Sequence, residues 1–302
     1  MIGQFETRIQ FNLPIKSNAM MLNVLIFCYN DSVGDVPQIF LPERGDVRYL
    51  VSHQMSEEYA VSHSSSPFHL PQEPLTAGTV EALGRADVVY SPFVGKGVSQ
   101  NRNHALHALT DWLAARSGGN MDGQICILAD DDVRYGADMP DRIMRIVSEY
   151  PEYDAFWGKI ATPDGQSDFK PYPRRSFEIH KVPVYGRFYS SSIEIFFRLA
   201  PVAENGLRFD ERFGLGSSVY PEGGEESVFL SDCLKAGLRL RYVPEYIVMH
   251  PYMSTGKSEK TVRKALMMEA VAVCCRGRLS SAALIGRLRV LYRRLLSSLH
   301  LL

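Results

Sequence analysis

Short apolar runs alternate with longer segments of helical periodicity along most of the chain. Three short apolar runs bounded by polar residues lie at 21–30, 47–52 and 86–91. Runs of this length predict buried β-strands. Residues 95–119 instead carry leucine and tryptophan at helical spacing, and the Gly118-Gly119 pair predicts the end of a helix. The apolar run that follows, at 125–129, predicts a fourth strand.

The second half of the chain continues this alternation. Residues 139–151 and 224–237 predict helices, and residues 153–160, 186–200 and 238–243 predict strands. Strands that alternate with helices are typical of an α/β fold, in which a mainly parallel central sheet is covered on both faces. In such sheets ligands bind beyond the carboxyl ends of the strands.

The pattern divides the chain into three parts. Residues 1–20 show no periodicity and predict an N-terminal tail, residues 21–256 predict one α/β domain, and residues 257–302 turn helical and basic, which predicts a C-terminal helical extension. One face of that extension carries Leu284, Leu288, Leu291 and Leu295. Two interpretations stay open: the helix lies on an anionic membrane surface, or it packs on the domain or on a second copy.

Composition excludes several classes of protein. The net charge of -1 and the pI near 6.7 give no reason to expect a nucleic-acid partner. The five cysteines are an odd number without a CxxC pair, which indicates a reducing compartment and no zinc site. Apolar stretches are too short to span a bilayer. We therefore expect a cytoplasmic protein, peripheral at the inner face of the membrane if the extension binds lipid.

Three consecutive carboxylates follow the fourth predicted strand. Asp130 and Asp132 are two residues apart, so both can point toward one place, and oxygen ligands in this arrangement suit a divalent metal, Mn²⁺ or Mg²⁺. Taken alone, the triplet is equally well a solvated acidic turn or a helix N-cap cluster. Asn30 and Asp31 follow the first strand and would lie at the same edge of the sheet.

Four features in order resemble the family 2 glycosyltransferases of the GT-A (Rossmann-like) fold, inverting enzymes that move a sugar from a nucleotide diphosphate. The features are VLIFCYN, GKGVSQNRNHAL, ILADDDV, and GEESVFLSDCLKAG followed by LRLRYVPEYIVMHP. The resemblance covers roughly residues 21–255. Two departures stand out, since Glu225-Glu226 replaces the usual Glu-Asp pair and CYN replaces the commoner Thr-x-Asn.

The resemblance implies a role for each matching residue. It implies contacts to the nucleotide-sugar donor by Tyr29, Asn30, Asp31, Arg102, Asp130 and Asp131, metal ligation by Asp130, Asp132 and His250, and a general base at Glu226, or at Glu225 if the register is one residue earlier. Each has a plainer interpretation. Arg102 could be a surface arginine that pairs an aspartate, the two glutamates could serve the helix dipole, and His250 could be structural.

The expected function is transfer of a sugar, with inversion, from a nucleotide-diphosphate sugar to a glycan or a lipid-linked acceptor. Two alternatives are a sugar-phosphate nucleotidyltransferase, whose glycine-rich N-terminal signature is absent, and an inactive glycan-binding or scaffold protein of the same fold. Residues 190–198 predict either the floor under the acceptor or a plain core strand. Trp157, Tyr185 and Tyr189 are candidate sugar platforms, although aromatic side chains near a core usually serve packing.

Overall fold

The computed structural model describes residues 20–63, 77–165, 167–183, 188–251 and 262–276. The strands are β1 (Met21–Tyr29), β2 (Val47–Met55), β3 (Val88–Val94), β4 (Gln124–Asp130), β5 (Ala155–Ala161), β6 (Phe177–Ile179), β7 (Ile195–Arg198) and β8 (Leu240–Met249). The helices are α1 (Glu57–Ser62), α2 (Ala77–Leu83), α3 (Val98–Ser117), α4 (Met139–Glu149), α5 (Leu199–Glu204), α6 (Glu225–Lys235) and α7 (Val262–Arg276), with 3-10 turns η1 (Asn30–Ile39) and η2 (Ser192–Glu194).

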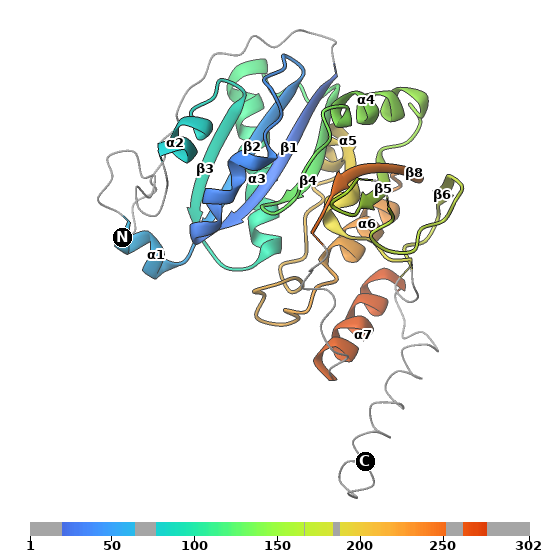
Figure 1. The fold of residues 1–302 in the computed structure, drawn as a ribbon. Coiled ribbons are helices and arrows are strands. Elements are labelled where there is room, and N and C mark those ends of the chain that lie inside the picture. Colours follow the sequence, from blue (N-terminus) through green and yellow to red (C-terminus); the bar gives the residue numbers. More distant parts are fainter. Residues whose placement is uncertain (1–19, 64–76, 166, 184–187, 252–261, 277–302) are drawn as a thin grey trace, which may run out of the picture.

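The strands form one sheet in the order β3-β2-β1-β4-β7-β5-β8-β6 (Figure 1). Strands β1, β2, β3 and β4 pair in parallel, and so do β5 and β8. Strand β7 is antiparallel to both β4 and β5, and β6 is antiparallel to β8. The prediction of an α/β fold with a mainly parallel central sheet is confirmed.

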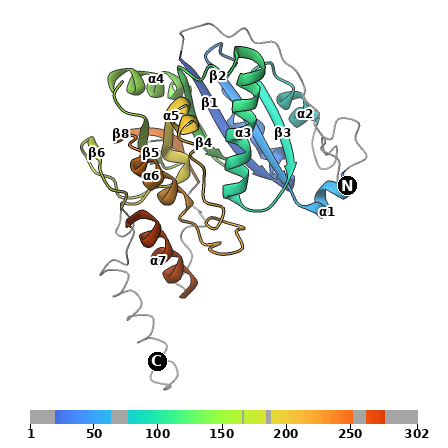
Figure 2. The ribbon, with the colours of Figure 1, turned by 180° about the vertical axis from the view of Figure 1, so that it is seen from behind.

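Two hydrophobic cores cover the two faces of the sheet. Successive residues of a strand point to opposite faces, and on β1 the side chains of Val24 and Ile26 enter one core while Leu25 and Phe27 enter the other. Helix α4 packs on the first face, and helices α3, α5 and α6 supply the second. Figure 2 shows α3 lying across β1 and β2 on that second face.

The segment predicted as one strand at 186–200 is divided in the structure. Only β7 is a strand, preceded by η2 and followed directly by α5. The buried carboxylate of Glu194 accepts a hydrogen bond from the backbone nitrogen of Ser191 at 2.8 Å, which closes a tight turn before the strand. A local side-chain bond of this kind competes with the extended backbone that the apolar pattern favours.

Helix α7 is the part of the C-terminal extension that the structure describes. It packs on α6 through Met267, Val271 and Ala272, which contact Phe213 and Val228. The predicted leucine stripe at 284–295 and most of the N-terminal tail lie outside the described residues. Among the described helices none is long and apolar enough to cross a bilayer.

Candidate functional site

The predicted site residues gather at the carboxyl edge of the sheet. Strands β1 and β4 run in parallel with Phe27 opposite Asp130, so the loops that follow them leave the sheet side by side. Strand β8 runs in the same direction, and an isolated bridge pairs its last residue, Met249, with Arg134 in the turn after β4. This bridge brings His250 next to the acidic triplet, although the two are far apart in the sequence.

Arg102 lies at the centre of a group of carboxylates. Its Nη1 donates to Oε1 of Glu225 at 2.6 Å, and its Nη2 lies 3.7 Å from Oδ1 of Asp130. The Arg102 side chain is only 3% exposed, and the rings of Phe27 and Phe209 flank it. Burial alone lowers the pKa of Arg102, but the charges of Glu225 and Asp130 outweigh it and raise that pKa. Arg102 is therefore a buried ion-pair partner, and its contact with a nucleotide stays a prediction.

Glu225 and Glu226 open helix α6 with different surroundings. The Glu225 side chain is 8% exposed, and its Oε2 atom is buried with no hydrogen-bond partner in the described part of the chain. Glu226 is half-buried. Burial raises the pKa of Glu226, the neighbouring Glu225 charge raises it further, and Arg102 opposes both. Of the two residues, Glu226 is the less buried.

Asp132 and His250 form a second pair, with 3.3 Å between Oδ1 and Nε2. The His250 Nδ1 atom lies 2.8 Å from the carbonyl oxygen of Pro251 and must donate to it, because a carbonyl only accepts. Burial lowers the pKa of His250, but the bond to Asp132 raises it above its ordinary value. The same bond lowers the pKa of Asp132. In a neutral His250, Nε2 therefore keeps a lone pair that faces Asp132.

The residues fit a metal ion only in part. Within the described ranges, no group of three His, Cys, Asp or Glu side chains is arranged to hold a metal. Asp132 and His250 offer two adjacent ligands, whereas Asp130 faces Arg102. Mg²⁺ commonly uses one or two protein carboxylates and takes its remaining ligands from substrate phosphates and water. The pair thus suits a cation that arrives with a diphosphate, and a preformed three-ligand centre is not what the geometry shows.

The middle carboxylate of the triplet has a different partner. Burial raises the pKa of Asp131 to about 6, a hydrogen bond with Ser32 opposes this shift, and the charges of Asp130 and Asp132 add to it. The repulsion expected of three adjacent carboxylates is relieved in three directions, toward Arg102, Ser32 and His250. Ser32 belongs to η1, so Asp131 also joins the turn after β4 to the turn after β1.

The backbone is strained where β1 ends. Asn30 has a φ of 48°, the one positive value found for a residue other than glycine in the described chain. Its side-chain oxygen accepts from the backbone nitrogen of Ser56 at 2.9 Å, and its carbonyl oxygen lies 2.9 Å from Nε2 of His53. Such strain often accompanies a binding site. Tyr29 and Asp31, the predicted neighbours at the nucleotide, are both exposed here.

His53 supports the turn at Asn30 and was not singled out by the sequence pattern. It is fully buried at the carboxyl end of β2, between the Asn30 carbonyl and the hydroxyl of Tyr90. Burial lowers the pKa of His53 to about 4, so it is neutral at pH 7. The sequence carried a signal for His53. Polar residues follow the apolar run of β2, as they follow the apolar run of β1.

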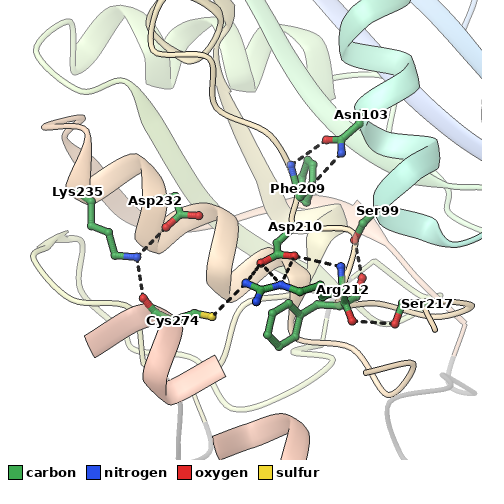
Figure 3. Close-up of polar contacts among 10 residues, drawn as sticks. Ser99, Asn103, Phe209, Asp210, Arg212, Ser217, Asp232, Lys235 and Cys274 are labelled. Atoms are coloured by element: carbon green, nitrogen blue, oxygen red, sulfur yellow. Dashed lines mark hydrogen bonds and ion pairs between the residues drawn. The ribbon is translucent and has the colours of Figure 1, made fainter. Parts of the chain in front are cut away.

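The loop before α6 is fastened on two sides (Figure 3). On one side, the Asn103 amide of α3 exchanges two hydrogen bonds with the backbone of Phe209, and the Ser99 hydroxyl donates to the carbonyl of Phe213 at 2.7 Å. On the other side, a guanidinium nitrogen of Arg212, which lies in this loop, donates to the sulfur of Cys274 in α7 at 3.9 Å. The bonds from Asn103 and Ser99 hold the loop that leads into α6 against α3, the helix that also carries Arg102.

The three aromatic residues predicted as candidate sugar platforms differ in their exposure to solvent. Trp157 is 1% exposed and stacks on Phe188 with 4.2 Å between ring centroids, so it is a packing residue and the platform hypothesis is wrong for it. Tyr185 lies outside the described residues. Tyr189 is 46% exposed and remains available to a ligand.

Comparison with known proteins identifies the fold. No family model matches the chain, and no curated protein matches it. Among solved structures, it is similar to S. aureus TarS 1-349 (TM-score 0.51, 14% identity) and to the same fragment in complex with UDP-GlcNAc (TM-score 0.53, 13% identity). Each match covers 84% of this chain. The chain spans 65% and 66% of those fragments, and 39% of a longer TarS structure.

These similarities establish the class of fold. The chain has a mixed α/β, GT-A-like fold. Because the sequence identities are only 13% to 15%, these similarities show the fold and do not show a particular family or activity.

Proposed function

We propose that this chain is a glycosyltransferase that uses a nucleotide-diphosphate sugar. The observation that carries the proposal is the convergence, at one edge of a GT-A-like sheet, of the Asp132–His250 pair and of Glu226 beside Arg102. The similar TarS fragment is described in complex with UDP and with UDP-GlcNAc, which makes a uridine diphosphate sugar the first donor to test. The strained turn at Asn30 and the exposed Tyr29 lie at the strand end where the nucleotide would bind.

Asp132 and His250 are the proposed protein ligands of Mn²⁺ or Mg²⁺. A divalent cation neutralises charge on a departing diphosphate without proton transfer. For this purpose His250 must be neutral at Nε2, and its bond to the Pro251 carbonyl keeps its one ring proton on Nδ1. Asp130 and Asp131 stay candidates for contacts to the donor.

Glu226 is the proposed general base. In an inverting transfer, the acceptor oxygen attacks the anomeric carbon, the bond from that carbon to the diphosphate oxygen breaks, and the acceptor's proton passes to the base. The pKa of Glu226 is raised above the ordinary value of a glutamate, and a carboxylate with a higher pKa is a stronger base. Arg102 and Glu225 are positioning residues, because their ion pair joins α3 to the first turn of α6.

The acceptor is proposed to be a glycan or a lipid-linked glycan, with a cytoplasmic location at or near the membrane. A catalytically inactive glycan-binding protein is the rival interpretation. The fact that Asp132, His250, Glu225 and Glu226 lie at one edge of the sheet favours an enzyme, since a subunit without activity has no need to keep them together. No observation favours a nucleotidyltransferase.

Calorimetry of UDP and UDP-GlcNAc binding, with and without Mn²⁺, tests the proposal. We expect metal-dependent binding, and we expect Asp132→Asn to weaken the metal-dependent part by about tenfold or more, since it removes ligand charge with little change of volume. Asp122→Asn, on an exposed turn before β4, is the matched control and should change nothing. Absence of binding for both nucleotides in the unaltered chain, with Mn²⁺ or Mg²⁺, would contradict the proposal.

A further inference from the structure

Tyr189 presents its ring to solvent above a buried charge. The residue is 46% exposed, and the ammonium nitrogen of Lys170 lies 4.2 Å from the centroid of its ring. The same nitrogen donates to the carbonyl oxygen of Tyr189 at 2.7 Å. Lys170 therefore holds both the backbone and one side of the ring of this residue, and the solvent-exposed part of the ring is left open.

A buried network holds Lys170 in this position. Its ammonium also donates to Oγ of Ser191 at 2.7 Å and to Oε1 of Glu194 at 2.6 Å, so all three of its donors have partners. Glu194 is fully buried, and its Oε2 accepts from the hydroxyl of Tyr172 at 2.5 Å. Because this charge is neutralised and its hydrogen bonds are complete, Lys170 is not available to a ligand. Its bond to the carbonyl oxygen of Tyr189 fixes the backbone of that residue from beneath.

The same segment is joined to the helix that carries the proposed base. The hydroxyls of Ser190 and Ser227 lie 3.3 Å apart, and both residues are buried. Ser190 follows Tyr189 and Ser227 follows Glu226, so the bond brings the backbone of the Tyr189 segment close to the first turn of α6. Burial, then the charges of Glu194 and Glu226, raise the pKa of Tyr189. The exposed ring is thus in electrostatic reach of the proposed base.

We propose that Tyr189 is the acceptor platform, and that the acceptor presents a pyranose ring whose apolar C–H face stacks on the tyrosine ring while one hydroxyl points to Glu226. A ring held rigid from beneath loses little conformational freedom when a ligand binds, which favours binding. The proposal rests on the proposed function, because it describes the second substrate of the same reaction. It assigns the acceptor to sugars and excludes acyclic polyols.

Saturation-transfer NMR on the full chain tests the platform without a known acceptor. The probes are the α- and β-methyl glycosides of glucose, galactose and N-acetylglucosamine, with sorbitol as the acyclic comparison. We expect saturation of the ring C–H protons of at least one glycoside and none for sorbitol. Absence of transfer to every glycoside, or equal transfer to sorbitol, overturns the proposal.

Variants assign the signal to the ring. Tyr189→Phe keeps the ring and should retain the signal, whereas Tyr189→Ala and Tyr189→Leu should lose it. The matched control is Phe177→Ala, which removes another exposed aromatic side chain, 38% exposed, on the edge strand β6. A signal that persists in Tyr189→Leu or Tyr189→Ala, or one that Phe177→Ala abolishes to the same extent, overturns the proposal.

Calorimetry of UDP binding separates this inference from the proposed function. We expect Tyr189→Leu to bind UDP and Mn²⁺ as the unaltered chain does, because the platform does not contact the donor. A chain that binds glycosides through Tyr189 but binds no nucleotide would disprove the glycosyltransferase and leave the sugar platform standing. A chain that binds UDP but no glycoside would disprove the sugar platform and leave the proposed glycosyltransferase function standing.

Discussion

The two glutamates in the first turn of α6 have different proposed roles. Glu225 is occupied by Arg102, whereas Glu226 is the less buried of the two. We expect Glu226→Gln to bind the donor normally and to lower kcat by about 10² to 10⁴, the usual contribution of a positioned base. Glu225→Gln should lower kcat far less. Turnover and donor affinity of both variants are the measurement, and the reverse order of effects would move the base to Glu225.

The pH profile should report the interaction between these two groups. The pKa of Glu226 is raised, first by burial and then by the Glu225 charge. A base works when it is unprotonated, so kcat/KM should fall as the pH drops through that raised pKa. Glu225→Gln removes the like charge and frees Arg102 to favour the Glu226 carboxylate, and both changes lower the pKa of Glu226. The acidic limb of kcat/KM should therefore move to lower pH in this variant, and a shift to higher pH would contradict the assignment.

At the residue scale, the sequence predicts which side chains matter better than it predicts their partners. The acidic triplet, Glu226 and His250 could be recognised from motif order, and they do lie at one edge of the sheet. The pairing of Arg102 with Glu225 could not, because 123 positions separate them and an ion pair leaves no periodic pattern. Glu194 was likewise hidden, since an apolar run shows where a strand lies but not which buried charge closes the turn before it.

At the scale of elements, the contact between α6 and α7 depends on one glycine. Gly224 has a φ of 93°, and a Cβ atom there would lie 2.5 Å from Cγ2 of Val271 and 3.0 Å from the sulfur of Met267. We expect Gly224→Ala to displace α7 and to lower the free energy of unfolding by more than the cost of the backbone conformation alone, about 1–2 kcal/mol. Urea unfolding measures it.

The matched control for this substitution lies at the other end of the same helix. Gly237 has a φ of 88°, and a Cβ atom there would meet nothing within 4 Å. Gly237→Ala therefore carries the backbone strain without the steric contact. Equal destabilisation by the two substitutions would show that the packing of α7 on Gly224 contributes nothing.

Elements were more predictable than their order in the sheet. Strands β1, β2, β3 and β4 and helices α3, α4 and α6 were recognisable from apolar periodicity, because each has a buried face. The short edge strand β6 and the 3-10 turn η1 were not, since three residues or an irregular turn carry too little pattern. The antiparallel insertion of β7 was equally hidden, because strand direction depends on connections that periodicity does not encode.

At the scale of the whole molecule, membrane binding by the extension beyond α7 is a prediction of its own. If the leucine stripe at 284–295 lies on a membrane, the full chain should pellet with anionic vesicles, added salt should reduce pelleting, and a chain ended at Gly277 should stay folded in the supernatant. Vesicle co-sedimentation at two salt concentrations measures this. Loss of stability or a changed oligomeric state on truncation, without vesicle binding by either chain, would identify a packing helix.

The position of β7 has a consequence for synthesis on the ribosome. Strands β1 to β4 form a continuous block, so they can pair as soon as they emerge. Strand β5 emerges next, yet its neighbours in the sheet are β7 and β8, which are made later. Until then the edges of β4 and β5 have no partner, and open edges of this kind are templates for aggregation. The nascent chain is therefore most exposed to misassembly between the release of β5 and that of β8, and this interval is when a chaperone would protect it most.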